Sequence, residues 1–161
     1  MAVTHRPAGF SAVTPYLLVE DAERLLAFLC DAFGAQELEP HRVTIPDGRI
    51  MNAAVRIDDA ILELGTASST FPARTGAFHL YVADVDSAYA RALAAGARPL
   101  YAPRVQFYGD REAGIVDPAG ITWFLATHLR DVPPHELAQS VVRSSPAPTD
   151  TPSGSEHQLH K

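Results

Sequence analysis

Two titratable side chains, Glu63 and His79, lie within predicted strands at positions that could face a cavity. Glu63 interrupts an otherwise apolar strand, and the burial of an unpaired carboxylate is costly. It therefore either faces a cavity or forms a salt bridge, for instance to Arg56 or Arg111. His79 lies in a second alternating run. A carboxylate and an imidazole on inward positions could act as general base and acid, and the carboxylate alone could balance the charge of a cationic ligand.

Two similar halves carry these side chains. Residues 14–35 are echoed by residues 77–97, and Asp21 matches Asp84 at a separation of 63 positions (84 − 21). In each half an alternating strand runs into an aspartate that can cap a helix, an amphipathic helix follows, and a glycine ends it. The repeat predicts one module present twice.

Short alternating runs separated by turn residues follow each helix, as expected for antiparallel strands. Each half then reads as βαβββ, and the predicted fold class is α+β, with two modules forming a curved mixed sheet around a cavity. A lone module would expose the sheet face opposite its helix, so two modules must cooperate, within the chain or across a dimer. The strands expected after the helices are 41–46, 49–57 and 60–65 in the first half, and 98–101, 104–109, 112–116 and 121–128 in the second.

The ends of the chain differ from its middle. Two prolines at 133–134 precede a short helical pattern, and the residues after it are rich in Pro, Ser, Thr and Gly with few apolar side chains. The predicted organisation is an N-terminal extension at 1–12, paired modules at 13–130 (13–66 and 76–128), a C-terminal helix at 131–143 and a flexible tail at 144–161.

Composition limits the function classes. With 161 residues, 47% of them apolar and 20% charged, the chain is expected to form one globular domain. A net charge of −6 argues against nucleic acid as a partner. No secretory signal or membrane span is expected, so the protein should be soluble with no membrane partner. The single cysteine, Cys30, excludes an internal disulfide and suits the cytoplasm.

Four segments carry a family resemblance: VEDAERLLAFLCDAFGA, PDGRIMNAAVRIDDAILELG, YVADVDSAYARALAAGA and GDREAGIVDPAGITWFLATH. Over residues 13–128 they resemble the vicinal oxygen chelate superfamily of glyoxalases, bleomycin-resistance proteins and extradiol dioxygenases. The DPxG turn before the last strand is similar to the branch labelled PhnB-like. The resemblance implies the paired-module fold and a homodimer. It implies no single reaction, because members include lyases, isomerases, dioxygenases and proteins that only sequester a drug.

The resemblance also implies a metal site with one residue on the first and one on the last strand of each module. The matching positions here are Thr14, Glu63, Ala77 and Phe124. Only Glu63 is a strong ligand, and a catalytic divalent site normally needs three. The inherited chelate is therefore expected to be lost, and no cofactor is predicted.

A shifted divalent metal site is the alternative. His79 has the same strand parity as the lost position 77, so it could combine with Glu63 and a third ligand, His41 or His128. The simpler interpretation is that His79 and Tyr16, which occupy equivalent positions in the repeats, line the cavity as hydrogen-bonding groups.

A cavity without the chelate is expected to bind planar ligands, since aromatic rings offer faces for stacking. Trp123 and Phe124 are neighbours on one strand, so only one can point inward; parity with Glu63 favours Phe124 and assigns Trp123 to the core. Arg111 either pairs with Asp110 at a strand edge or meets an anionic ligand. The predicted ligand-binding residues are Thr14, Tyr16, Asn52, Glu63, His79, Tyr101, Phe107, Tyr108, Arg111, Trp123 and Phe124.

Two functions follow from these residues. The first is metal-independent binding of a small aromatic or planar molecule, of the antibiotic-resistance and sequestration type. The second is a lyase, isomerase or cyclase that uses Glu63 and His79 as acid and base.

Overall fold

The computed structural model describes residues 5–144, so the tail predicted from residue 144 lies almost entirely outside the described residues. Residues 134–144 form a helix, as their pattern predicts. No helix in the described part has the length and apolar character needed to cross a bilayer. The element order is β1 (Tyr16–Val19), α1 (Ala22–Phe33), β2 (Gln36–Glu37), the 3-10 helix η1 (Glu39–His41), β3 (Val43–Thr44), β4 (Ile50–Ile57), β5 (Ala60–Thr66), β6 (Ala77–Tyr81), α2 (Val85–Ala94), β7 (Arg98–Val105), β8 (Asp110–Val116), β9 (Thr122–His128) and α3 (Pro134–Ser144).

The two repeated helices begin and end where the sequence predicts. The Asp21 side chain accepts a hydrogen bond from the backbone N–H of Arg24 at the start of α1. The Asp84 side chain accepts from the N–H groups of Asp86 and Ser87 at the start of α2. These bonds satisfy helix donors that have no partner within the helix. Gly34 closes α1 in the left-handed conformation, with φ of 67°.

The strands form two separate mixed sheets, which confirms the α+β class and the doubled module. The first sheet has the order β1-β5-β4-β2, with β3 also paired to β4, and the second has the order β6-β9-β8-β7. In each, the first strand of the module pairs in parallel with the last, and the remaining pairs are antiparallel.

The predicted strands at 98–101 and 104–109 are wrong as two strands. They form one strand, β7, which ends at Val105 and carries irregularities on both sides of Tyr101. Residues 106–109 form the turn to β8, closed by a hydrogen bond from the Gly109 N–H to the Gln106 carbonyl, with Gly109 at φ of 99°. The expected strand at 41–46 shrinks to two residues, while β2 and η1 are elements that the alternation did not predict.

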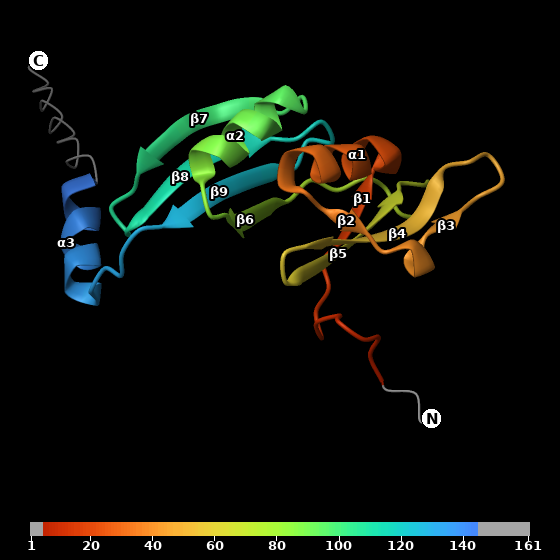
Figure 1. Ribbon diagram of the computed structural model, residues 1–161, viewed down its shortest axis with the longest axis horizontal. Coiled ribbons are helices and arrows are strands. Elements are labelled where there is room, and N and C mark those ends of the chain that lie inside the picture. Colours follow the sequence, from red (N-terminus) through yellow and green to blue (C-terminus); the bar gives the residue numbers. More distant parts are fainter. Residues whose placement is uncertain (1–4, 145–161) are drawn as a thin grey trace, which may run out of the picture.

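The two modules contact each other through their helices. Helix α1 packs against α2, the Arg91 guanidinium donates to the Ala32 carbonyl over 3.2 Å, and the ring centroids of Phe33 and Trp123 are 5.0 Å apart. In Figure 1 the two sheets lie towards opposite ends of the molecule with α1 in the middle. Each sheet packs against helices, and by the uncovered face of a sheet we mean the face on the side away from α1 and α2.

Candidate ligand-binding site

The uncovered face of the second sheet is defined by strand register. Partners at one level of a sheet point to the same side, so each row below shares a face. We call the following two rows the second-sheet face: His79, Phe124, Gly114 and Tyr101, and next to them Tyr81, Ala126, Glu112 and Arg104.

Glu112 is one of two buried acids on this face. It is only 6% exposed, yet its carboxylate accepts a hydrogen bond from the Tyr101 hydroxyl over 2.6 Å. The Nε2 atom of His79 lies 3.4 Å from its other oxygen. Burial, followed by the Glu112 carboxylate, raises the pKa of both Tyr101 and Tyr108 above the ordinary phenol value. Both tyrosines thus stay neutral and act as donors around a carboxylate.

Asp110 continues the same face two residues earlier on β8. It is 3% exposed and accepts a hydrogen bond from the Tyr81 hydroxyl over 3.1 Å. The His128 ring nitrogen Nδ1 lies 2.7 Å from the other Asp110 oxygen. Hydrogen bonding to Asp110 is the main cause that raises the pKa of His128.

Gly114 makes room for Tyr101. A Cβ atom at position 114 would lie 2.5 Å from the Tyr101 ring, closer than side chains tolerate. The ring therefore lies across the missing side chain, which brings the Tyr101 hydroxyl to the carboxylate of Glu112 on the same strand as Gly114.

The uncovered face of the first sheet holds the other predicted carboxylate. Tyr16 pairs with Glu63, which in turn pairs with Ala54, and in the next row Leu18 pairs with Gly65. These residues make up the first-sheet face. Burial and the nearby Glu63 carboxylate raise the pKa of Tyr16.

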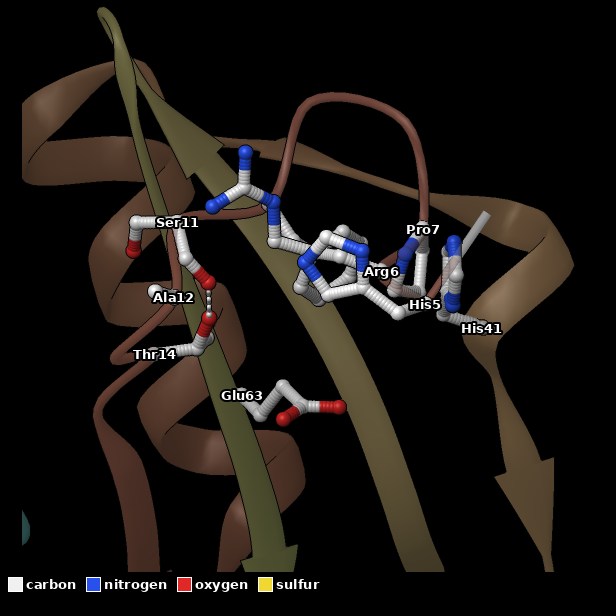
Figure 2. A pocket seen from close by; sticks show the side chains of 9 residues that line it. His5, Arg6, Pro7, Ser11, Ala12, Thr14, His41 and Glu63 are labelled. Atoms are coloured by element: carbon white, nitrogen blue, oxygen red, sulfur yellow. Dashed lines mark hydrogen bonds between the residues drawn. The ribbon is translucent and has the colours of Figure 1, made fainter.

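Glu63 lines a pocket of about 350 Å³. Figure 2 shows the N-terminal segment from His5 to Thr14 arching over one side of this hollow, with His41 and Glu63 on its walls. The Thr14 hydroxyl donates to the Ser11 carbonyl over 3.2 Å. Three of the residues singled out from sequence, Thr14, His41 and Glu63, thus share one pocket.

A second, more apolar hollow of about 620 Å³ adjoins Tyr16 and is also lined by Leu18, Met51 and Phe71. The Tyr16 hydroxyl donates to the Met51 carbonyl over 3.1 Å. A Cβ atom at Gly65 would lie 2.7 Å from that hydroxyl, so glycine is needed for this contact. Tyr16 lines this second hollow, and its strand partner Glu63 lines the first.

The remaining predicted binding residues fall in different places. The Asn52 side chain donates to the His41 carbonyl over 3.1 Å, which ties β4 to the end of η1 beside the Glu63 pocket. Phe107 and Tyr108 lie in the turn between β7 and β8 with their rings packed edge to face, 5.1 Å apart. Phe124 is half-buried in the first row of the second-sheet face.

Trp123 and Arg111 are both engaged by acidic side chains of the protein. Trp123 is 2% exposed, and its indole N–H donates to the Asp117 carboxylate over 2.9 Å on the helix side of β9. The guanidinium of Arg111 binds Asp86 through two hydrogen bonds of 2.7 Å. Arg111 does not pair with its sequence neighbour Asp110, because alternation along β8 turns consecutive residues to opposite faces, and Glu63 lies on the other sheet.

The expected acid–base pair of Glu63 and His79 is also not formed within the chain. Glu63 lies on β5 of the first sheet and His79 on β6 of the second, and His79 instead contacts Glu112. The proposed salt bridge of Glu63 to Arg56 or Arg111 is absent from the ion pairs of residues 5–144.

Comparison with known proteins decides the family. The model of the Glyoxalase/Bleomycin resistance protein/Dioxygenase superfamily matches residues 10–125, most of the chain. The chain belongs to this superfamily. The match is to the glyoxalase superfamily as a whole and does not single out the PhnB-like branch.

Individual proteins are similar to the chain in sequence or in structure. The chain is 36% identical to the uncharacterized protein Rv0887c of Mycobacterium tuberculosis over 148 residues, covering 85% of this chain and 84% of that protein. Among solved structures, it is similar to TioX from Micromonospora sp. ML1, with 24% identity, a TM-score of 0.62 and coverage of 74% of this chain and 99% of TioX. Protein PA1353 from Pseudomonas aeruginosa matches with 15% identity, a TM-score of 0.60, and coverage of 73% and 98%.

The metal site that the family resemblance implies does not fit the residues at its four matching positions. Of the four matching positions, Ala77 and Phe124 carry no donor atom and the Thr14 hydroxyl is bonded to the backbone. Within one chain the donors of the shifted site are divided between the sheets, since Glu63 and His41 line one pocket while His79 and His128 contact carboxylates on the other sheet. Among residues 5–144, no three acidic, histidine or cysteine side chains are grouped to hold an ion.

Sequence reasoning missed Glu112 and Asp110 as site residues. Their signal was present, because acids at positions 110 and 112 alternate with Arg111 on a strand whose later residues are apolar. Without the register of β8 against β9, that pattern reads equally well as the polar start of a strand.

Proposed function

We propose that this protein binds a small planar or aromatic organic molecule, without a metal ion, in a cavity formed by two copies of the chain. The first-sheet face of one copy would meet the second-sheet face of the other. The binding is of the sequestration type associated with antibiotic resistance, and the single cysteine suits the cytoplasm as its location.

The observation that carries this proposal is the character of the two uncovered faces. Helices pack on one face of each sheet. On the opposite faces, Tyr16 of the first sheet is 44% exposed and Tyr81 of the second sheet is 57% exposed. Exposed aromatic side chains on a sheet face are typical of surfaces that a ligand or partner covers. A homodimer can cover both faces at once. If a two-fold axis places the first-sheet face of one copy on the second-sheet face of its partner, the same axis places the second-sheet face of that copy on the first-sheet face of the partner.

The ring of Tyr81 offers the sharpest test of binding. It is stacked on His79 with ring centroids 4.6 Å apart. With 1-naphthalenemethanol as the probe, Tyr81→Leu should weaken binding about three- to tenfold because it removes a stacking surface. Tyr81→Phe keeps the ring and should bind within about twofold of the unchanged protein on the same reasoning. Isothermal titration measures the affinity of the unchanged protein and of both variants.

The dimer is tested separately. Light scattering during gel filtration should give twice the mass of one chain.

Two results would contradict the proposal. One is a monomer at micromolar concentration that does not bind 1-naphthalenemethanol. The other is stoichiometric zinc, iron, manganese or nickel in the purified protein, because the proposed binding uses no metal ion.

An enzyme of the lyase, isomerase or cyclase kind is the second candidate, and one contact favours it. His79 and Glu112 approach within 3.4 Å on a face that also carries the Tyr101 hydroxyl, so an acid and a base lie beside each other. Mass spectrometry of incubated aromatic metabolites separates the two functions, because a sequestering protein returns its ligand unchanged. Turnover that Glu112→Gln abolishes and Glu63→Gln retains would establish the enzyme.

A further inference from the structure

A pocket on the first-sheet face is lined by side chains of opposite charge. The pocket of about 350 Å³ that Glu63 lines is also lined by His5, Arg6 and His41. In Figure 2 the carboxylate of Glu63 projects from the sheet, and the N-terminal segment that carries His5 and Arg6 passes above it. The pocket therefore has an acidic group on its sheet side and basic side chains on the side of the N-terminal segment.

The carboxylate of Glu63 is the acidic group, and it has no partner of its own. It takes part in none of the side-chain hydrogen bonds or ion pairs among residues 5–144. Glu63 is also half-buried, so water reaches its carboxylate only in part. A charged donor that enters the pocket gains free energy there, because charge-assisted hydrogen bonds are stronger than neutral ones.

The N-terminal segment is anchored beside this carboxylate. The rings of Phe10 and His41 are in contact, with centroids 5.0 Å apart, and the Phe10 N–H donates to the Pro7 carbonyl over 3.3 Å. Gly9 has a φ of 84°, and a Cβ atom there would lie 3.0 Å from the Arg56 guanidinium. These contacts hold the segment against β4 and η1. The basic side chains that it carries therefore have a defined place on the pocket wall.

The more apolar hollow beside Tyr16 lies on the same face. Tyr16 and Glu63 are strand partners, and neighbouring strands are about 4.8 Å apart. The hollow has a volume of about 620 Å³, a size typical of pockets that enclose small organic ligands. Its lining includes the rings of Tyr16 and Phe71 and the Met51 side chain, which suit a planar apolar group. A charged pocket and an apolar pocket thus begin at two paired residues.

We propose that the ligand is an apolar amino acid or a close derivative, with a free ammonium and a free carboxylate at one end and a planar body at the other. The ammonium donates to Glu63, and the carboxylate accepts from Arg6 and the neighbouring imidazoles. The Arg6 guanidinium has five N–H donors, so it can serve more than one acceptor. The planar body lies in the hollow beside Tyr16. The inference rests on the proposed binding function and adds the chemical class of the ligand.

Four probes of one naphthalene skeleton test this class on the full-length protein. They are 1-naphthylalanine, 2-(1-naphthyl)ethylamine, 3-(1-naphthyl)propanoate and 2-(1-naphthyl)ethanol, which near neutral pH are zwitterionic, cationic, anionic and uncharged. In isothermal titration the zwitterion should bind about fivefold or more tightly than the amine and than the acid. Each of those two lacks one charge-assisted hydrogen bond, and a bond of that kind is worth about this factor or more.

Two substitutions should act on opposite ends of the charged group. Glu63→Gln should weaken binding of the zwitterion and the amine about five- to tenfold and should not weaken binding of the acid. Arg6→Gln should weaken binding of the zwitterion and the acid about threefold or more and should not weaken binding of the amine. Glu20→Gln and Arg24→Gln make the same charge changes at exposed positions and are the matched controls.

The outcomes separate the two proposals. A zwitterion that binds no more tightly than the amine and the acid, or an advantage that survives Glu63→Gln, overturns the amino-acid class and leaves aromatic binding standing. Should Glu63→Gln fail to fold, the comparison of the four probes on the unchanged protein decides alone. Failure of these probes and of 1-naphthalenemethanol to bind overturns both proposals.

Discussion

The Tyr101 hydroxyl donates a hydrogen bond of 2.6 Å to the buried carboxylate of Glu112, across adjacent antiparallel strands. This bond connects a residue predicted from sequence to bind ligand with one that sequence reasoning passed over. The pair ties the edge strand β7 to the middle of the second sheet.

The bond has a measurable consequence at high pH. Burial and Glu112 raise the pKa of Tyr101 and Tyr108 above 10.0, the ordinary value of a tyrosine phenol. Absorbance at 295 nm should therefore show two tyrosines that resist ionisation well above pH 10 in the folded protein, and one fewer in Tyr101→Phe. Because the folded pKa is the higher one, the stability contribution is complete below pH 10 and is lost as the pH rises towards the folded value. Simultaneous titration of all tyrosines near pH 10 in a protein still folded would contradict this.

Replacing Gly114 by alanine should disturb the same bond. The added Cβ would lie 2.5 Å from the Tyr101 ring, so the ring must move away from Glu112. We expect a loss of about 1–3 kcal/mol in the free energy of unfolding, typical of overpacking, measured by urea denaturation.

Gly76→Ala is the matched control for that substitution. The nearest atom to a Cβ at Gly76 is 4.0 Å away, so its effect should stay within about 0.5 kcal/mol. Equal losses at the two glycines would mean that backbone entropy, and not the Tyr101 contact, sets the cost.

Asp117 holds the turn before β9 and the indole of Trp123 together. Its buried carboxylate accepts hydrogen bonds from the backbone N–H groups of Ala119 and Ile121 and from the Trp123 indole. Asp117→Ala leaves three donors without an acceptor and should destabilise the fold by about 3 kcal/mol. Asp117→Asn retains one acceptor oxygen and should lose less. A red shift of the Trp123 emission maximum in the folded Asp117→Ala variant would report access of water to the indole.

The pair of His128 and Asp110 predicts a pH-dependent stability. The Asp110 hydrogen bond, followed by that of Asp131, raises the pKa of His128 above 6.5 in the folded state. The stabilisation is therefore complete below pH 6.5 and declines as the pH rises through the folded pKa. In urea denaturation, His128→Gln should be destabilising at pH 6 and nearly neutral at pH 9. His135→Gln, which removes an exposed imidazole on α3, is the control; equal effects of the His128 change at both pH values would refute the linkage.

The sequence by itself determined the modules. The aspartate caps at Asp21 and Asp84, the apolar stripes and the closing glycines are local signals, because capping and amphipathicity act within a few residues. Strand parity likewise assigned Trp123 to the core and Phe124 to the opposite face, since side chains alternate along any strand.

Only the tertiary structure decided which acids and bases meet. Glu63 and His79 match by parity but lie on different sheets, and Glu112 reaches His79 because β8 and β6 both flank β9. Such contacts depend on strand order and on the packing of α1 against α2, which join residues distant in the chain. Local periodicity fixes the face on which a side chain lies, whereas its neighbour on that face is fixed by the register between strands.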